Sequence, residues 1–238
     1  MKRFAIACIA FLSLAVAAYA VLAYTLLPFA AHVQPDVRAV FESHRLMLLV
    51  HIFAAAVALA LGPVQFSRRF RERWPAAHRM AGRLYLGVGV GIGGLSGLYV
   101  ALDGYGGPVA NAGFASLALA WLFTGARAFT AIRRRDVAEH RRWMVRNWSL
   151  TLAAVTLRLY MPMGMILGID YATAYAAIAW LCWVPNLAVA HFLVAAQYSH
   201  RHGTARSDRS GPSRNPRDLQ RGHRNLYGRL LRDGGEPG

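Results

Sequence analysis

The sequence predicts an all-α integral membrane protein with six transmembrane helices. Of its 238 residues, 56% are hydrophobic and 16% are charged, and a soluble domain of this size could not bury so much apolar surface. Six apolar segments reach the length of roughly 20 residues that a membrane-spanning helix needs. They lie at about 4–28, 46–66, 81–102, 113–132, 148–168 and 174–197.

The basic residues alternate between loops as the positive-inside rule describes. One side of the membrane would carry residues 2–3, six arginines in 68–83, six in 133–146 and nine in the tail, while Arg38 and Arg45 would lie on the other. This distribution places both termini in the cytoplasm and the spans in a bacterial cytoplasmic (inner) membrane. The net charge of +16 therefore reflects topology, and no nucleic-acid partner is expected.

Composition divides the chain into three regions. Residues 1–44 hold the first transmembrane helix and an outer loop, 45–197 form a five-helix membrane domain, and 198–238 form a basic tail that we expect to be disordered. The first helix contains Ala18-Tyr19-Ala20, which resembles a signal-peptide cleavage site. Because the apolar run continues beyond that site, we expect an uncleaved helix, which could act as a signal anchor.

Helices two to five are expected to form a four-helix core made of two similar hairpins. Basic loops at 67–79 and 133–146 close the hairpins, and each returning helix follows a His-Arg pair that begins at His78 or His140. The two histidines should lie at similar depth on the cytoplasmic side. Imidazole is a good haem ligand, so the pair could hold a haem b as its axial ligands. The alternative is that both rings contact lipid headgroups or neighbouring carbonyl groups.

Arg158 lies inside the fifth apolar segment, where an arginine costs roughly 2.5 to 3.5 kcal/mol. The predicted spans contain no Asp or Glu, so its partner must be an acid of an outer loop, such as Asp103 or Asp170, or a group of another kind. Backbone carbonyls and water are one possibility. A haem propionate, an anionic lipid phosphate or a quinone oxygen is the other. His51 in helix two could join Arg158 in an outer-side site that His44 extends, or it could be a packing residue.

Polar residues form stripes along helices five and three. Positions 18 apart point the same way on an α-helix, so His140 and Arg158 would share one stripe with Asn147 and Thr151. The corresponding stripe of helix three includes Tyr85. Both stripes should face the bundle interior, because polar side chains avoid lipid. The candidate ligand or pathway residues are therefore Tyr85, Asn147, Thr151, Asn186 and His191.

Helix three also carries six glycines between Gly87 and Gly97, several of them four residues apart. This spacing favours close helix packing, and it could also present a surface to a flat cofactor. Cys8 and Cys182 lie in different spans at different depths, so neither a disulfide nor a cysteine metal site is expected. The sequence contains no metalloprotease, P-loop or serine-elbow motif and does not declare an enzyme.

Four segments together resemble the bacterial membrane-protein family known as domain of unknown function 2306. They are HIFAAAVALALGPVQF, HRMAGRLYLGVGVGIGGLSG, HRRWMVRNWSLTLAAVTLRL and WVPNL, and the resemblance covers roughly residues 45 to 195. It implies a multi-pass membrane protein and brings no activity, substrate or cofactor with it. A likeness to four-helix b-type cytochromes rests on helix count and histidine placement alone.

Three functions agree with these observations, and the last of them is that of a structural or assembly partner in a membrane complex. The first is an electron-transfer protein that holds haem b or a quinone, with His78, His140, His51 and Arg158 as its cofactor-binding residues. The second is a transporter or small-ligand-binding protein without enzymatic activity. Its partners would be the lipid bilayer and, for the polar sites, a quinone or an anionic lipid. A homo-oligomer or a larger membrane complex is compatible with each of these functions.

Overall fold

The computed structural model describes residues 2–29 and 34–209, with the side chains of 4–29 and 34–196. Within these residues the chain is helical and contains no strand. The prediction of six helices that are long and apolar enough to cross a membrane is confirmed. They cover Phe4–Leu26, Arg45–Gln65, Pro75–Leu102, Gly107–Arg133, Val137–Ile166 and Tyr171–Ala196.

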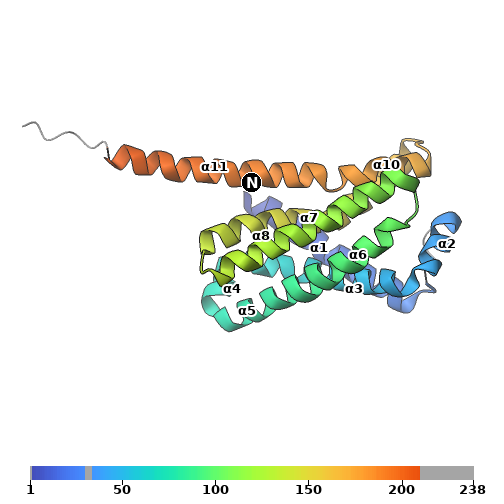
Figure 1. Cartoon of the computed structure of the whole chain (residues 1–238), viewed down its shortest axis with the longest axis horizontal. Helices are drawn as coiled ribbons and strands as arrows, with labels where there is room; N and C mark the ends of the chain where they lie inside the picture. The colour runs from blue at the N-terminus through green and yellow to red at the C-terminus, as the bar shows by residue number, and fades with distance from the viewer. Residues whose placement is uncertain (1, 30–33, 210–238) are drawn as a thin grey trace, which may run out of the picture. The chain divides into compact units, whose positions relative to one another are not determined.

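Several of these spans are built from more than one helical element (Figure 1). The described elements are α1 (Lys2–Leu26), α2 (Pro35–Ser43), α3 (Arg45–Gln65), α4 (Arg68–Arg73), α5 (Pro75–Leu84), the π-helix η1 (Tyr85–Ile92), α6 (Gly93–Leu102), α7 (Gly107–Arg133), α8 (Val137–Thr151), α9 (Ala153–Ile166), α10 (Tyr171–Leu181) and α11 (Val184–Arg209). Residues up to Val194 form one compact unit and those from Ala195 form a second. The sites described below belong to the first unit.

The basic loops expected at 67–79 and 133–146 are largely helical. Ser67 begins α4 by accepting a hydrogen bond from the Phe70 backbone N–H at 3.2 Å, and α5 follows directly from Pro75. Asp136 begins α8 in the same way, accepting from the Glu139 N–H at 2.8 Å. These caps satisfy N–H groups at the helix starts, so the helices extend well into the arginine-rich segments.

The two ends of the first unit differ in charge. We call the end that carries α4 and the connection 134–136 the basic end, because arginines surround both. The opposite end carries α2 and the short connections 103–106 and 167–170. At that end Asp170 caps α10, and the hydrogen bond from the Thr173 backbone N–H holds the pKa of its carboxyl below the usual value.

The tail expected to be disordered from residue 198 begins within a helix. α11 continues to Arg209, so it includes the first part of that segment. The rest of the predicted tail, 210–238, lies outside the described residues.

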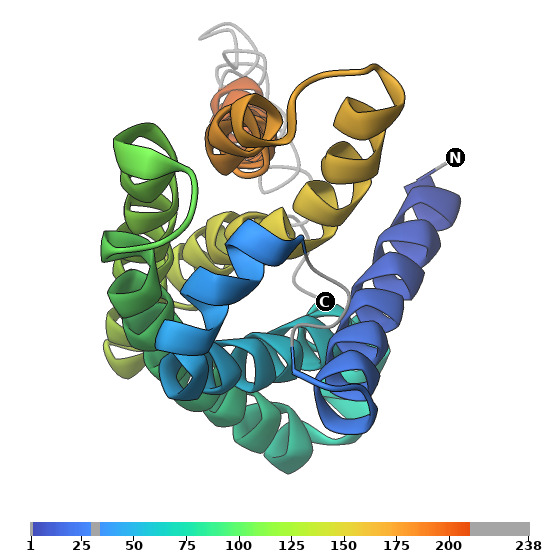
Figure 2. The ribbon, with the colours of Figure 1, turned by 90° about the vertical axis from the view of Figure 1, so that its right-hand side faces the viewer.

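Neighbouring spans pack in chain order. α3 packs against α1 on one side and against the span formed by η1 and α6 on the other, α6 packs against α7, and α7 packs along α8. Figures 1 and 2 show α3, α6, α7 and α8 running side by side. α8 also contacts α3, and α10 packs against α7 and α9.

Small residues allow these helices to approach closely, as is typical inside a membrane. A Cβ atom at Gly89 would lie 2.8 Å from Ala58 Cβ and 3.1 Å from Ala58 Cα, so η1 and α3 meet almost backbone to backbone. The large apolar side chains point outward instead. Phe11, Phe123 and Phe192 are all more than half exposed, as side chains that meet lipid should be.

The connections between spans give a direct test of orientation. We expect alkaline phosphatase, which folds to its active form only outside the cytoplasm, to be active when fused after Tyr105 and inactive when fused after Arg135. The reason is that arginine-rich connections remain in the cytoplasm. Enzyme activity and fusion-protein abundance would be measured in whole cells, and the reverse pattern would contradict the predicted orientation.

Candidate functional site

His78 and His140 occupy equivalent places at the basic end. Each lies in the first turn of its helix. His78 is four residues after Trp74, the residue just before α5, and His140 is four residues after Asp136, the residue just before α8. Their backbone N–H groups donate to the carbonyls of those two residues at 3.0 Å. The two imidazoles are near enough to interact electrostatically. The two histidines that the repeated His-Arg pairs single out therefore occupy corresponding positions at the same end of the bundle.

The His140 ring is oriented by a backbone group of the neighbouring helix. Its Nδ1 lies 2.9 Å from the carbonyl oxygen of Ala128 in α7. A carbonyl only accepts, so Nδ1 carries the proton in this contact and the neutral ring keeps a lone pair on Nε2. Metal-ligating histidines commonly have this arrangement, because the bond at one nitrogen fixes the tautomer and the ring plane.

Two buried polar atoms at the basic end have no hydrogen-bond partner among the residues that the structure describes. They are His78 Nδ1 and Gln65 Nε2. The Gln65 side chain lies against α5, because a Cβ at Gly82 would be 3.3 Å from its Oε1. Gly82 is one helical turn beyond His78. Leaving such groups unpaired costs about 1 to 3 kcal/mol each, so two of them near the same helix point to a binding function.

The polar residues at mid-span form a network among themselves. Tyr85 donates from its hydroxyl to Asn147 Oδ1 at 2.8 Å and lies 2.8 Å from Thr151 Oγ1. Asn147 Nδ2 donates to the Trp121 carbonyl at 2.8 Å and to Thr124 Oγ1 at 2.9 Å. Tyr85 and Asn147 are fully buried. Both amide protons of Asn147 and the Tyr85 hydroxyl are therefore engaged within the protein.

This network joins three spans. Trp121 Nε1 donates to Thr151 Oγ1 at 2.9 Å, so η1, α7 and α8 are connected through side chains. The predicted interior position of Tyr85, Asn147 and Thr151 agrees with their burial. Their observed partners are one another and α7, which makes them positioning residues of the fold.

Arg158 does not continue the stripe of Asn147 and Thr151. Its guanidinium donates from Nη1 to the Ala154 carbonyl at 3.0 Å and lies 5.9 Å from the centre of the Tyr19 ring in α1. A break at Leu152 separates α8 from α9. His51 is close enough to interact with Arg158 electrostatically. His51 in α3 and Arg158 in α9 thus both lie in the halves of their spans that are farther from the basic end.

Two candidates from the sixth span lie elsewhere. Asn186 Nδ2 donates to Thr156 Oγ1 at 3.0 Å and to the Cys182 carbonyl at 2.9 Å, which stabilises the interruption between α10 and α11. His191 is exposed and packs edge-on to Phe192 at 6.1 Å. The structure does not bring either residue to His78 and His140.

Protein side chains fill much of the glycine face of the third span. A Cβ at Gly93 would meet Ala54 and Trp121, one at Gly94 would meet Leu122 at 2.6 Å, and one at Gly97 would meet His51 at 2.6 Å. Close packing therefore accounts for these glycines. The side chains of neighbouring helices take the space that a flat cofactor would need on this face.

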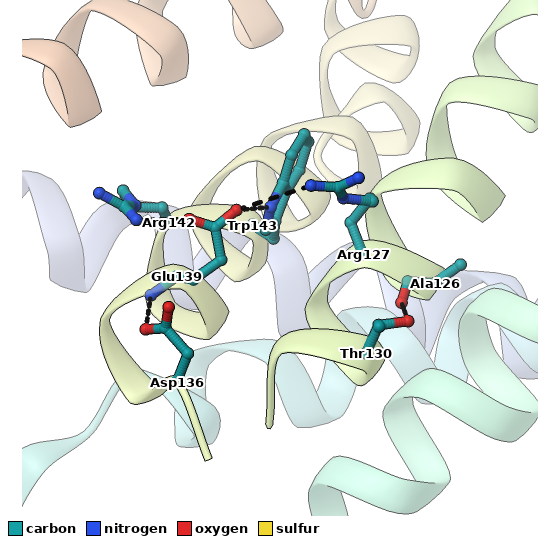
Figure 3. A network of polar contacts seen from close by, with 7 residues as sticks. All are labelled: Ala126, Arg127, Thr130, Asp136, Glu139, Arg142 and Trp143. Atoms are coloured by element: carbon teal, nitrogen blue, oxygen red, sulfur yellow. Dashed lines mark hydrogen bonds and ion pairs between the residues drawn. The ribbon is translucent and has the colours of Figure 1, made fainter. Parts of the chain in front are cut away.

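Glu139 is an acidic residue whose role the sequence analysis did not foresee. Figure 3 shows its carboxylate between Arg127, Arg142 and Trp143. The Trp143 indole donates to it at 2.5 Å, Arg142 forms an ion pair with it, and Arg127 Nη2 is 3.9 Å away. This carboxylate therefore balances the charge of Arg142 in α8 and of Arg127 near the end of α7.

In the part of the chain with described side chains, no three His, Cys, Asp or Glu residues come together as a metal-binding group. The candidate centre at the basic end thus consists of two imidazoles and the unpaired Gln65 amide. The sequence analysis did not single out Gln65 as a site residue. The signal in the sequence that could have identified Gln65 is that it is a polar amide residue at the end of an apolar helix.

The comparison with protein families agrees with this architecture. Residues 48–194 match the family described as predicted membrane protein (DUF2306). The chain belongs to this family. The DUF2306 region contains His51, His78, His140 and Arg158, so both clusters lie within the part that family members share. No curated protein and no solved structure matches the chain.

Tyr85 tests the mid-span network. Tyr85→Phe should destabilise the protein by about 1 to 2 kcal/mol, because Asn147 Oδ1 loses its donor where no water can replace it. Unfolding in detergent on titration with sodium dodecyl sulfate, followed by tryptophan fluorescence, would measure the change. The matched control is Tyr160→Phe, since Tyr160 packs against the core and makes no hydrogen bond within the described residues. Equal losses in both variants would contradict a special role for the network.

Proposed function

We propose that this DUF2306 protein is a membrane electron-transfer protein that binds haem b between His78 and His140. The observation that carries the proposal is the 2.9 Å contact between His140 Nδ1 and the Ala128 carbonyl, because it leaves Nε2 free as a ligand atom. The second histidine supports it. His78 lies at the same end of the bundle as His140, comes from the other hairpin and has a buried nitrogen without a hydrogen-bond partner among the described residues.

The surrounding residues fit a haem as well. The buried Gln65 amide lacks an acceptor, which a propionate oxygen would supply. Arg71 and Arg79 interact electrostatically with His78, so cationic groups are available to balance the negative charge of the propionates. Among the described side chains the proposed centre has two imidazoles and no third metal-ligating residue, an arrangement better suited to a haem than to a bare metal ion.

Haem b supplies the exchange of single electrons when it is bound. The residues of this chain would hold the iron between two imidazoles, fix the His140 ring through α7 and neutralise the propionates at the basic end. With the orientation N-in and C-in that the arginine distribution predicts, this centre would lie at the cytoplasmic face of the inner membrane. Electrons would then pass between the membrane and a partner on that side.

An absorption spectrum tests the proposal. The detergent-purified protein, expressed with adequate haem supply, should show a Soret band that shifts on reduction with dithionite. His78→Ala and His140→Ala should each lose most of the pigment, because a six-coordinate haem loses half of its axial ligation. His191→Ala is the matched control, since this exposed histidine lies outside the site.

A ligand exchange provides a sharper test. His78→Met should retain haem and raise its reduction potential, as Met/His ligation does compared with two histidines. Potentiometric titration would measure the shift. A colourless but monodisperse wild-type protein, or unchanged absorption in both alanine variants, would overturn the proposal.

A further inference from the structure

Arg158 is a mid-span cation without an acidic partner. The ion pairs among the described side chains do not include it, and its hydrogen bond goes to the Ala154 carbonyl one turn earlier in α9. A guanidinium has five N–H donors in a rigid fork, so this single bond leaves most of its hydrogen-bonding capacity unused. A charged residue within a span marks a functional site by default.

His51 complements the arginine as an acceptor. Its Nδ1 lies 2.8 Å from the Gly93 carbonyl, so the proton of the neutral ring is on Nδ1 and the lone pair on Nε2. The ring is held tightly, because it packs where a side chain at Gly97 would otherwise lie. Arg158 therefore offers donors and His51 offers an acceptor on α9 and α3, two helices that pack together with α1 through Val155, Leu59 and Ala17.

The first helix contributes aromatic groups to the same region and leaves it open toward lipid. Tyr19 and Tyr24 of α1 both interact with Arg158 electrostatically. Arg158 is partly exposed and Tyr19 is 47% exposed, so the protein does not seal the site. A molecule that diffuses within the bilayer could reach it from the side.

The depth of the site restricts the chemistry of its ligand. Arg158 is eight residues from the end of α9 at Ile166, which corresponds to about 12 Å along the helix. A lipid phosphate would have to leave the interface and enter the hydrocarbon by that distance. A neutral headgroup with carbonyl oxygens can lie there at much lower cost.

We infer that Arg158 and His51 bind the headgroup of a membrane quinone. In the oxidised form a ring carbonyl accepts from the Arg158 guanidinium, and in the reduced form a ring hydroxyl can donate to His51 Nε2. The exposed Tyr19 ring offers an apolar surface to the headgroup, while the isoprenoid tail remains in lipid. This site shares no residue with the haem centre proposed at the basic end, so either can fail without the other.

Quinone binding by the full chain provides the test. The purified protein in detergent would be titrated with decylubiquinone, and quenching of its tryptophan fluorescence would give the Kd. Arg158→Gln should raise this Kd roughly 10- to 100-fold, because a charge-assisted hydrogen bond is lost. Arg127→Gln is the matched control, since this arginine pairs with Glu139 at the basic end and should leave the Kd unchanged.

Two further measurements separate binding from folding. Arg158→Leu should raise the thermal unfolding temperature in detergent while abolishing quinone binding, because it removes an unpaired cation from the span. His51→Asn should weaken binding of decylubiquinol more than that of decylubiquinone. Unchanged quinone affinity in a folded Arg158 variant would overturn the inference. So would saturable, Arg158-dependent binding of phosphatidylglycerol without any binding of the quinone.

Discussion

The hydrogen bonds of Asn147 hold the membrane-spanning helices in register. Inside a bilayer no water is present to form hydrogen bonds with an amide, so the hydrogen-bond partners of this side chain must come from the protein. It finds them in Tyr85 of η1 and in Thr124 and the Trp121 carbonyl of α7. Apolar packing alone would let these helices slide or rotate against one another, because lipid is as apolar as their surfaces. The network thus fixes how η1, α7 and α8 are arranged relative to one another.

Much of the architecture could be predicted because the bilayer imposes simple rules. Its thickness fixes the length of a span, and its lack of water turns polar side chains inward. Hydrophobicity therefore identified six spans, and helical periodicity identified Tyr85, Asn147 and Thr151 as interior residues. The repeated His-Arg pairs also marked two histidines that occupy equivalent positions, since each lies in the first turn of a returning helix.

The contact partners of the polar side chains could not be predicted, because they depend on backbone groups and on neighbouring helices that the sequence alone does not identify. Periodicity gives the direction of a side chain from its own helix axis, but it does not say which neighbour it meets. The acceptor of His140 is a backbone carbonyl at Ala128, which any residue type could provide. The break at Leu152 and the cap at Asp136 are local events that change the helix bounds. For these reasons Arg158 does not share a stripe with Asn147, although the sequence predicted that it would. For the same reasons the sequence analysis did not identify the Gln65 amide, which has no hydrogen-bond partner among the described residues.

The π-helix between Tyr85 and Ile92 sets the angular relation between the two ends of its span. Each residue of a π-helix turns the chain through a smaller angle about the helix axis than a residue of an α-helix does. The length of η1 therefore determines which way the side chains of α6 point relative to those of α5. Upstream of it lies His78, and downstream lies Gly97, against which His51 packs. Deleting one residue within η1 would therefore rotate one end relative to the other, by an angle below the roughly 100 degrees that one α-helical residue contributes. The orientation of the region around His78 relative to the region around His51 and Gly97 thus depends on one helical segment, η1.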